Sequence, residues 1–369
     1  LGVTVFTCDR LNVDFRRCLS IVPDHMGAKD HWKAWRSANV LSVALCSCLV
    51  AYTSDPRLSL WPNSMASVVA FAFFIAFILL PHPMFLRTRR AIAKTIGRIL
   101  VTPLKGATFR EIFVCDLLTS TPLALFRTEY AVCFIGVGQF LNTEDAMVPC
   151  SQFRDNFSQE KIHNHCYSGS MNFSVAQPLA ALIPFWLRME QCLFLAWRTH
   201  KAAGACRQRT LHLINTGKYL VAIIVVLLAT FKALIPSERG KQQMQFVVYF
   251  MSVVKAVYSG IWDFAMDWGL GTRGLQGAHR GLRPTLRLAP WQYWAITVFN
   301  VMGRFTFMVA ISPNQPTFEV VAVLLGVVEI VRRGVWATLR LEWECVKNGW
   351  DKETAQRKSS ERVAEDPLV

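Results

Sequence analysis

The run VVAFAFFIAFILL at residues 68–80 decides which class of fold this chain adopts. It lies inside residues 58–86, a stretch that carries no charged side chain. A helix needs roughly 20 mostly apolar residues to cross about 30 Å of hydrocarbon. The stretch therefore predicts a membrane-spanning helix, and the fold of the remaining chain has to be compatible with a bilayer.

Seven more segments have the length and apolar content of a membrane span. One of them is also uncharged, whereas the other six contain ionisable side chains. In chain order they are residues 37–54, 112–141, 172–197, 214–235, 243–264, 291–312 and 318–342. The sequence thus predicts an all-α polytopic membrane protein with about eight transmembrane helices.

The composition agrees with this class. Of the 369 residues, 53% are hydrophobic and only 18% are charged, which leaves too little polar surface for several soluble domains. The same composition excludes disordered, collagen-like and small disulfide-stapled proteins. The 11 cysteines form no CxxC pair, so nothing indicates a zinc site or thioredoxin-like chemistry.

The net charge of +15 lies mainly in alternate connections between the spans. Segment 87–110 has seven basic residues, 198–209 has four, and 273–287 has four arginines. Because cytoplasmic loops carry an excess of Lys and Arg, we expect both ends of the chain in the cytosol. The charge is then explained by topology and by attraction to anionic lipid, and no nucleic-acid partner is expected.

The long connection 144–171 is expected on the opposite side of the membrane. Asn156 and Asn172 begin Asn-Phe-Ser patterns, which accept glycans only on the non-cytosolic side. In that oxidising space, Cys166 is expected either to form a disulfide with Cys133 or Cys150 or to remain a thiol like them.

Several charges fall inside the predicted spans or close their ends, and at the bilayer centre each would cost about 2.5–3.5 kcal/mol on insertion scales. Asp116, Lys218, Asp263, Asp267, Arg304, Arg332 and Arg333 are the charged positions in question. Asp263 and Asp267 are four residues apart, so an α-helix would place both on one face. Interhelical ion pairing is one interpretation. The other is an anion path, because adjacent arginines share one nearby carboxylate, Glu329, and guanidinium groups suit phosphate oxygens.

Other chemistry has little support. His163 and His165 have no evident third ligand, and no Ser-His-Asp set, GxSxG elbow or phosphate-cradling glycine loop occurs. We therefore expect no enzyme activity, no cofactor and no metal.

Five motifs in order carry a resemblance to a known family. They are CDLLTS at 115–120, FWLRMEQCL at 185–193, HLINTGKY at 212–219, IWDFAMDWGL at 261–270 and EIVRRGVWATLRLEWE at 329–344. The chain resembles the EXS domain, the carboxy-terminal membrane half of eukaryotic phosphate exporters. That family includes the xenotropic and polytropic retrovirus receptor, plant Pho-type and yeast Syg-type proteins.

The resemblance implies six helices of an EXS bundle around a phosphate path. By position, its pathway residues are Asp116, Thr119, Ser120, Arg188, Lys218, Tyr219, Asp263, Asp267, Arg304, Arg332 and Arg333. Phe307 is the gate candidate, at a place where relatives usually have Trp. The motif near the end departs from the usual AsnGluHis, since this chain has Trp343, Glu344 and Cys345.

The resemblance also implies an organisation. We expect a cytosolic amino-terminal segment at 1–33, two helices with a basic connector at 34–110, the EXS domain at 111–345, and a cytosolic tail at 346–369. The chain starts with Leu1 and is expected to be part of a longer protein. Relatives sense inositol pyrophosphates through an SPX domain, and nothing in residues 1–33 matches that domain.

The implied function is export of inorganic phosphate by a gated, channel-like path. The protein is expected in the lipid bilayer of the plasma membrane or the Golgi, and a homodimer is one assembly that the resemblance allows. One alternative is a Golgi-type member that recycles phosphate from the lumen. The other is a receptor or scaffold that transports nothing, in which the buried charges pair with one another.

Overall fold

The computed structural model describes residues 2–20, 86–102, 106–136, 172–200, 206–271, 281–306 and 318–350, with a few isolated helical positions between 39 and 76. Within these ranges the regular structure is helical and contains no strand, as the sequence predicts. The chain divides into two compact units. We call residues 35–248 the central unit, and residues 1–34 together with 249–369 the terminal unit.

Three described helices are long and apolar enough to cross a membrane. They cover Ser174–His200, Cys206–Leu234 and Glu238–Asp267, and they coincide with the spans expected at 172–197, 214–235 and 243–264. The expected spans 37–54 and 58–86 lie almost wholly outside the described residues. The all-α membrane class is therefore confirmed, whereas the number of spans stays a prediction.

The long helices turn apolar side chains outward. On helix α10 (Cys206–Leu234) the exposed positions Leu220, Leu227, Phe231 and Leu234 recur at intervals of seven, four and three residues. Helix α11 (Glu238–Trp262) exposes Phe246 and Phe250 in the same way. Such stripes on a water-soluble surface would be unfavourable, and facing lipid they are the expected arrangement.

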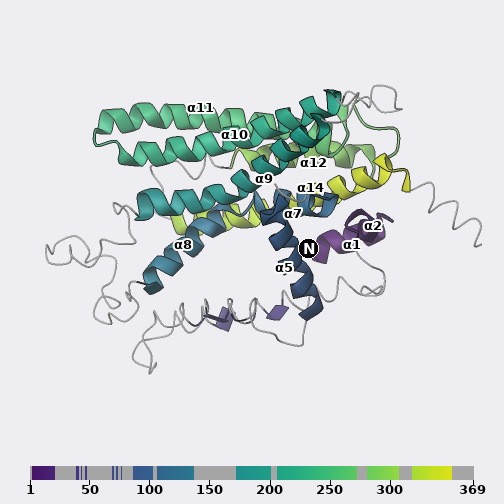
Figure 1. Cartoon of the computed structure of the whole chain (residues 1–369), viewed down its shortest axis with the longest axis horizontal. Coiled ribbons are helices and arrows are strands. Elements are labelled where there is room, and N and C mark those ends of the chain that lie inside the picture. Colours follow the sequence, from purple (N-terminus) through teal and green to yellow (C-terminus); the bar gives the residue numbers. More distant parts are fainter. Residues whose placement is uncertain are drawn as a thin grey trace, which may run out of the picture. The chain divides into compact units, whose positions relative to one another are not determined.

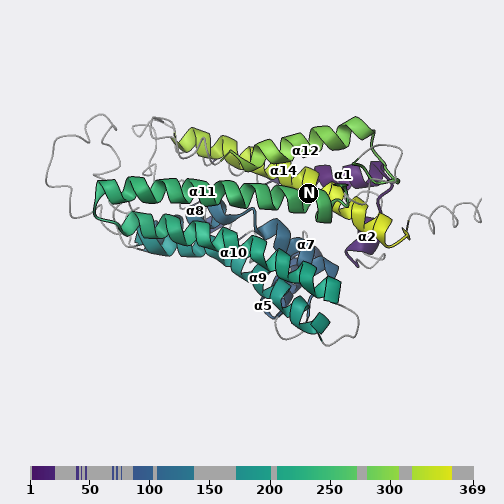
Figure 2. The same ribbon diagram turned by 90° about the horizontal axis from the view of Figure 1, so that it is seen from above.

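The central unit is built on helices α9 (Gln177–His200) and α10, which lie side by side (Figures 1 and 2). Helix α8 (Pro122–Gly136) also packs on α9. A short π-helical turn, η6 (Asn172–Ala176), leads into α9. The buried core between α9 and α10 consists of Leu182, Phe185, Cys192, Tyr219, Ala222 and Ile223.

The span expected as one helix over 112–141 is interrupted. Helix α7 (Phe109–Leu118) ends before Thr119, and α8 begins at Pro122. Proline lacks a backbone N–H and disfavours helical conformation in the residue before it, so a helix ends ahead of it and a new one begins with it. The break places Thr119 and Ser120 at a helix end.

The start of α7 is fixed by a capping arrangement. The Thr108 backbone N–H donates to Glu111 Oε2 at 2.7 Å, and the Thr108 hydroxyl donates to the same oxygen. Arg98 of helix α5 (Leu86–Leu100) lies 3.5 Å from Glu111 Oε1. Burial by itself would raise the pKa of Glu111, but the hydrogen bonds from Thr108 and the charge of Arg98 outweigh it and lower the pKa.

The terminal unit is organised around the long helix α14 (Phe318–Lys347). It contacts α12 (Pro290–Arg304), the π-helical turn η7 (Asp263–Asp267) that ends α11, and two short helices, α1 (Gly2–Arg10) and α2 (Phe15–Cys18). Figure 2 shows α12 running beside α14.

Gly269 shows why the motif after η7 needs a glycine. Its φ is +63°, and a Cβ there would lie 2.4 Å from the indole of Trp343. Its neighbours Trp268 and Leu270 are fully buried. Only glycine combines this left-handed conformation with so close an approach of a ring.

Candidate functional site

The central unit contains a buried ion pair between Asp116 of α7 and Arg188 of α9. Arg188 Nε donates to Asp116 Oδ1 at 2.6 Å, and Nη2 donates to Oδ2 at 3.2 Å. Tyr219 of α10 donates its hydroxyl to the same Oδ1 at 2.5 Å. The side chains of Asp116 and Arg188 are 8% and 5% exposed, so this is a bidentate pair removed from water.

Further polar groups extend this central network. Arg188 Nη1 donates to Gln191 Oε1 at 3.3 Å, and Gln191 Nε2 donates to Thr102 Oγ1 at 3.4 Å. Lys218 places its ammonium 4.5 Å from the centre of the Tyr219 ring and interacts electrostatically with Asp116. The carboxylate of Asp116 thus attracts two cations, Arg188 and Lys218.

The two hydroxyl residues at the break between α7 and α8 lie next to this network in sequence. The Thr119 hydroxyl donates to the Asp116 carbonyl oxygen at 2.7 Å and so caps a carbonyl at the end of α7. The Ser120 backbone N–H donates to the carbonyl of Leu117 at 3.1 Å. Thr119 therefore supports the backbone that carries Asp116.

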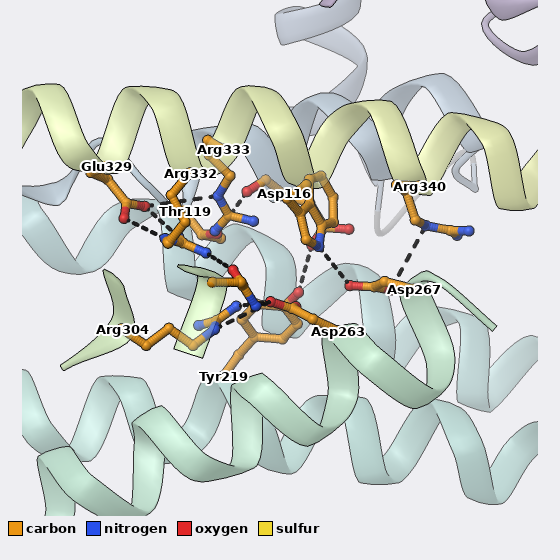
Figure 3. A network of polar contacts seen from close by, with 12 residues as sticks. Asp116, Thr119, Tyr219, Asp263, Asp267, Arg304, Glu329, Arg332, Arg333 and Arg340 are labelled. Atoms are coloured by element: carbon orange, nitrogen blue, oxygen red, sulfur yellow. Dashed lines mark hydrogen bonds and ion pairs between the residues drawn. The ribbon is translucent and has the colours of Figure 1, made fainter. Parts of the chain in front are cut away.

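The terminal unit holds a second network, at the meeting of η7, α12 and α14 (Figure 3). Asp263 Oδ2 accepts hydrogen bonds from Arg304, including one from Nε at 3.2 Å. Asn300 Nδ2 also donates to Asp263 Oδ2, at 2.8 Å, while Asn300 Oδ1 accepts from Arg332 Nη1 at 2.8 Å. A neutral amide thus connects one guanidinium–carboxylate pair to the next arginine.

Two adjacent arginines share one carboxylate in this terminal network. Arg332 Nη2 lies 2.6 Å from Glu329 Oε1, and Arg333 Nε lies 3.9 Å from the same oxygen. The Arg333 guanidinium lies over the Trp336 ring at 4.9 Å. The Arg332 side chain is 3% exposed, whereas Glu329 is 32% exposed, so Glu329 is the more exposed partner.

Gly303 explains how Arg332 reaches α12. A Cβ at this position would lie 2.8 Å from Cδ of Arg332. The arginine stem therefore lies directly across α12 at the residue that precedes Arg304, where no side chain obstructs it.

Asp267 serves a different set of partners from Asp263. It accepts from Trp336 Nε1 at 3.2 Å and lies 3.7 Å from Arg340 Nε (Figure 3). Residues 263–267 form a π turn, closed by the Trp268 N–H to the Asp263 carbonyl at 2.9 Å, in place of the regular α-helix that the sequence predicts there. Both aspartates are buried, at 1% and 7% exposure, each against its own neighbours.

Asn300, Lys255 and Glu329 belong to the terminal network but were not among the predicted site residues, although the sequence offered Glu329 as the carboxylate near the two arginines. Asn300 has no formal charge, so its burial carries no signal in the sequence. Lys255 of α11 interacts electrostatically with Arg304, Glu329 and Arg332. The sequence did carry a signal for Lys255, because it is the only cation in the span expected at 243–264 and lies near its middle.

The predicted residues therefore fall into two sets. Asp116, Thr119, Ser120, Arg188, Lys218 and Tyr219 belong to the central unit, while Asp263, Asp267, Arg304, Arg332 and Arg333 belong to the terminal unit. Each set is brought together within its own unit. That all of them line one path stays a prediction.

Some candidates lie at or beyond the limits of the described residues. Phe307, Cys150, Cys166 and Asn156 lie outside them. Asn172 begins η6. Cys133, in α8, is disulfide-bonded, and its pairing with Cys166 stays a prediction.

Arginine-rich networks of this kind have a definite chemistry. Guanidinium groups held in fixed directions by carboxylates and amides offer N–H donors to a second acceptor, and tetrahedral oxyanions match that fork. A group of cations that share carboxylates inside a membrane also favours an added anion electrostatically.

These features define the class as an all-helical integral membrane protein with buried ion-pair networks. The EXS family matches residues 1–346, and the chain belongs to that family.

Relatives agree with this assignment. Solute carrier family 53 member 1 of Mus spretus is 27% identical over 330 residues, covering 86% of this chain and 44% of the relative. SPX and EXS domain-containing protein 1 of Dictyostelium discoideum is 24% identical over 365 residues, covering 94% of this chain and 35% of the relative. A xenotropic and polytropic retrovirus receptor 1 homolog of Danio rerio is 27% identical over 316 residues, covering 83% and 41%. The chain spans less than half the length of these relatives.

Proposed function

We propose that this chain moves inorganic phosphate out of the cytosol, through a gated path whose anion-binding part is the terminal network. The observation that carries the proposal is the sharing of Glu329 by Arg332 and Arg333, with Arg304 held by Asp263 on the adjoining helix. The names of the relatives support it, since they designate solute carriers.

In the proposed mechanism, phosphate competes with Glu329. Glu329 is the more exposed partner, and Arg332 is kept in place by Asn300 when Glu329 withdraws. The phosphate oxygens then take the N–H donors of Arg332 and Arg333. Since Glu329 returns when the anion leaves, binding is strong enough for entry and weak enough for release.

Asp263 has a separate role in this mechanism. It fixes Arg304 and, through Asn300, the direction of Arg332. Asp263 also offers an acceptor to a protonated phosphate. The driving force is the membrane potential, which is worth about 2.3 kcal/mol per charge per 100 mV and pushes an anion away from a negative cytosol.

The remaining parts of the proposal concern the setting of the protein. We infer cytosolic ends, a plasma-membrane or Golgi location, and Lys218 and Arg188 as central-unit members of the same path. Phe307 is proposed as the gate, and regulation by inositol pyrophosphate would require an SPX domain outside the residues of this chain. Location of the tagged protein separates the export role from luminal recycling in the Golgi.

The test is phosphate flux through the purified chain in liposomes under an imposed potential. Arg304→Ala and Arg332→Ala are expected to abolish flux, because each removes a donor fork from the terminal network. Arg239→Ala is the matched control, since Arg239 is exposed at the start of α11 and its loss should leave flux unchanged. Normal flux in both network variants would contradict the assignment.

The ion pairs themselves favour a second candidate. Arg188 with Asp116, Arg304 with Asp263 and Arg332 with Glu329 are each a direct pair. In a receptor or scaffold, such pairs would serve folding alone. Absence of phosphate flux in the unmodified, correctly folded chain would favour that function.

A further inference from the structure

Two buried thiols from opposite ends of the chain meet in the terminal unit. Sγ of Cys18, in α2, lies 3.1 Å from Sγ of Cys345, near the end of α14. The two residues are 3% and 1% exposed, and both are thiols in the structure. Cys345 also stands where the usual AsnGluHis of the EXS motif has its histidine, and in the structure its sulfur contacts Cys18.

The amino-terminal segment, residues 2–20, is held in the terminal unit by several independent contacts. Val13 and Phe15 are buried, at 3% and 4% exposure. Arg287 donates to the Leu11 carbonyl, and Arg17 lies over the Trp350 ring at 5.1 Å. Figures 1 and 2 show α1 and α2 beside α14. The meeting of the two sulfurs thus follows from the packing of the whole segment.

Each of the two thiols also forms a hydrogen bond to a backbone carbonyl across the contact between α2 and α14. The Cys18 thiol donates to the Leu341 carbonyl at 3.8 Å, and the Cys345 thiol donates to the Asp14 carbonyl at 3.8 Å. Each thiol is therefore bonded to the backbone of the element that carries the other. A third thiol, Cys8, is fully buried in the same segment and interacts electrostatically with Cys345.

We propose that Cys18 and Cys345 form a reversible disulfide when the protein meets hydrogen peroxide, and that this bond fastens the amino-terminal segment to α14. The modification is separate from the anion-binding role proposed above. It joins residues 327 positions apart, so it converts a segment held by packing into one held covalently.

The chemistry balances with one peroxide molecule. One thiol loses its proton, and its sulfur attacks a peroxide oxygen; the O–O bond breaks, giving a sulfenic acid and one water. The second thiol sulfur then attacks the sulfenic sulfur, the S–S bond forms, the S–O bond breaks, and a second water leaves. The two sulfurs together lose two electrons, which the peroxide gains.

Burial sets the rate of this reaction. Hydrogen bonding with Cys345, together with burial, raises the pKa of Cys18, and burial raises the pKa of Cys8 to about 12. Thiolates are the reactive form, so the closed segment reacts slowly. Oxidation then proceeds through transient opening of the segment, and loosening its packing should accelerate it.

The experiment treats the reduced, purified full chain in lipid nanodiscs with hydrogen peroxide and maps the products by mass spectrometry. Trypsin cleaves after Arg17 and Arg340, so the expected product is a cross-link between peptides 18–29 and 341–347. The cross-link should disappear on addition of a reducing agent. Oxidation of the exposed Cys206 serves as the internal control that the oxidant has reached the protein.

Matched variants separate the three thiols. Cys18→Ser and Cys345→Ser should each abolish the cross-link, whereas Cys8→Ser should retain it. Phe15→Ala should raise the rate several-fold. In the chain without substitutions, backbone amides of residues 2–20 should exchange hydrogen more slowly after oxidation.

Two results would overturn the proposal. One is oxidation of Cys206 to its sulfinic acid while Cys18 and Cys345 remain thiols. The other is a cross-link between peptide 341–347 and the peptide that contains Cys8. Both are measured on the unmodified chain, so a variant that fails to fold does not affect the conclusion.

Discussion

Replacing Asp116 by Ala should destabilise the central unit more than any other single change in its polar network. The carboxylate accepts two hydrogen bonds from Arg188, at 2.6 and 3.2 Å, and one from Tyr219 at 2.5 Å. It also attracts Lys218. Removing one partner of a buried ion pair costs about 3–5 kcal/mol, because the other charge stays buried. We expect a loss in that range for Asp116→Ala.

Smaller changes at the same place give a graded series. Tyr219→Phe removes one hydrogen bond to a charged group, which costs about 1.5–3 kcal/mol. Arg188→Met should cost less than Asp116→Ala, because Asp116 keeps Tyr219 and the attraction of Lys218. The double variant that combines Asp116→Ala with Arg188→Met should lose less stability than the sum of these two single losses, by about 2 kcal/mol or more.

The assay is equilibrium unfolding in mixed micelles, followed by tryptophan fluorescence, with the unmodified chain and the four variants at one pH and ionic strength. A loss below about 1 kcal/mol for Asp116→Ala, together with additive effects in the double variant, would refute the reasoning. Such a result would mean that water reaches the pair in the membrane-embedded state.

Three further predictions concern single positions. Lys255→Met should lower phosphate flux in liposomes about tenfold or more without loss of folded protein, since it removes a positive charge that interacts with Arg304, Glu329 and Arg332; unchanged flux would exclude Lys255 from the anion-binding part. Gly269→Ala should lower the melting temperature and the yield of folded protein, because it adds about 1–2 kcal/mol of left-handed strain to a clash with Trp343; an unaltered melting temperature would contradict this account of the motif. Glu111→Gln should reduce the acid sensitivity of thermal stability. The pKa of Glu111 is lowered from 4.5 in the folded state, so its contribution is present above that value and is lost as the pH falls through the folded pKa; equal acid sensitivity of the two proteins would argue against the capping role.

Length and apolar content were sufficient to predict α9, α10 and α11, because these two properties are what a helix needs to cross a bilayer. The break between α7 and α8 was missed although Thr121-Pro122 gives a local signal for it. Counting apolar residues over a long window averages such a signal away. The π turn had no signal at all, since two aspartates four residues apart fit an α-helix equally well.

The candidate site was predictable where burial is expensive. Arg304, Arg332 and Arg333 stood out because an ionised side chain inside a span has to be compensated. Asn300 joins the same network through two hydrogen bonds at 2.8 Å, but an amide in a helix is common and carries no comparable cost. Sequence reasoning thus finds the charges and misses the neutral groups that direct them.

The π turn at the end of α11 has a consequence for how the terminal unit responds to change. An i to i+5 closure holds one residue more than a regular helical turn, so the residues that follow the turn are displaced by about one position, or roughly 100° of rotation. That offset lets a single helix end address α12 with one aspartate and α14 with the next. Deleting one residue from this turn would rotate the chain beyond it and so displace Asp267 from Trp336 and Arg340. The extra residue thus sits between Asp263, which supplies counter-charge to Arg304, and Asp267, which supplies it to Arg340.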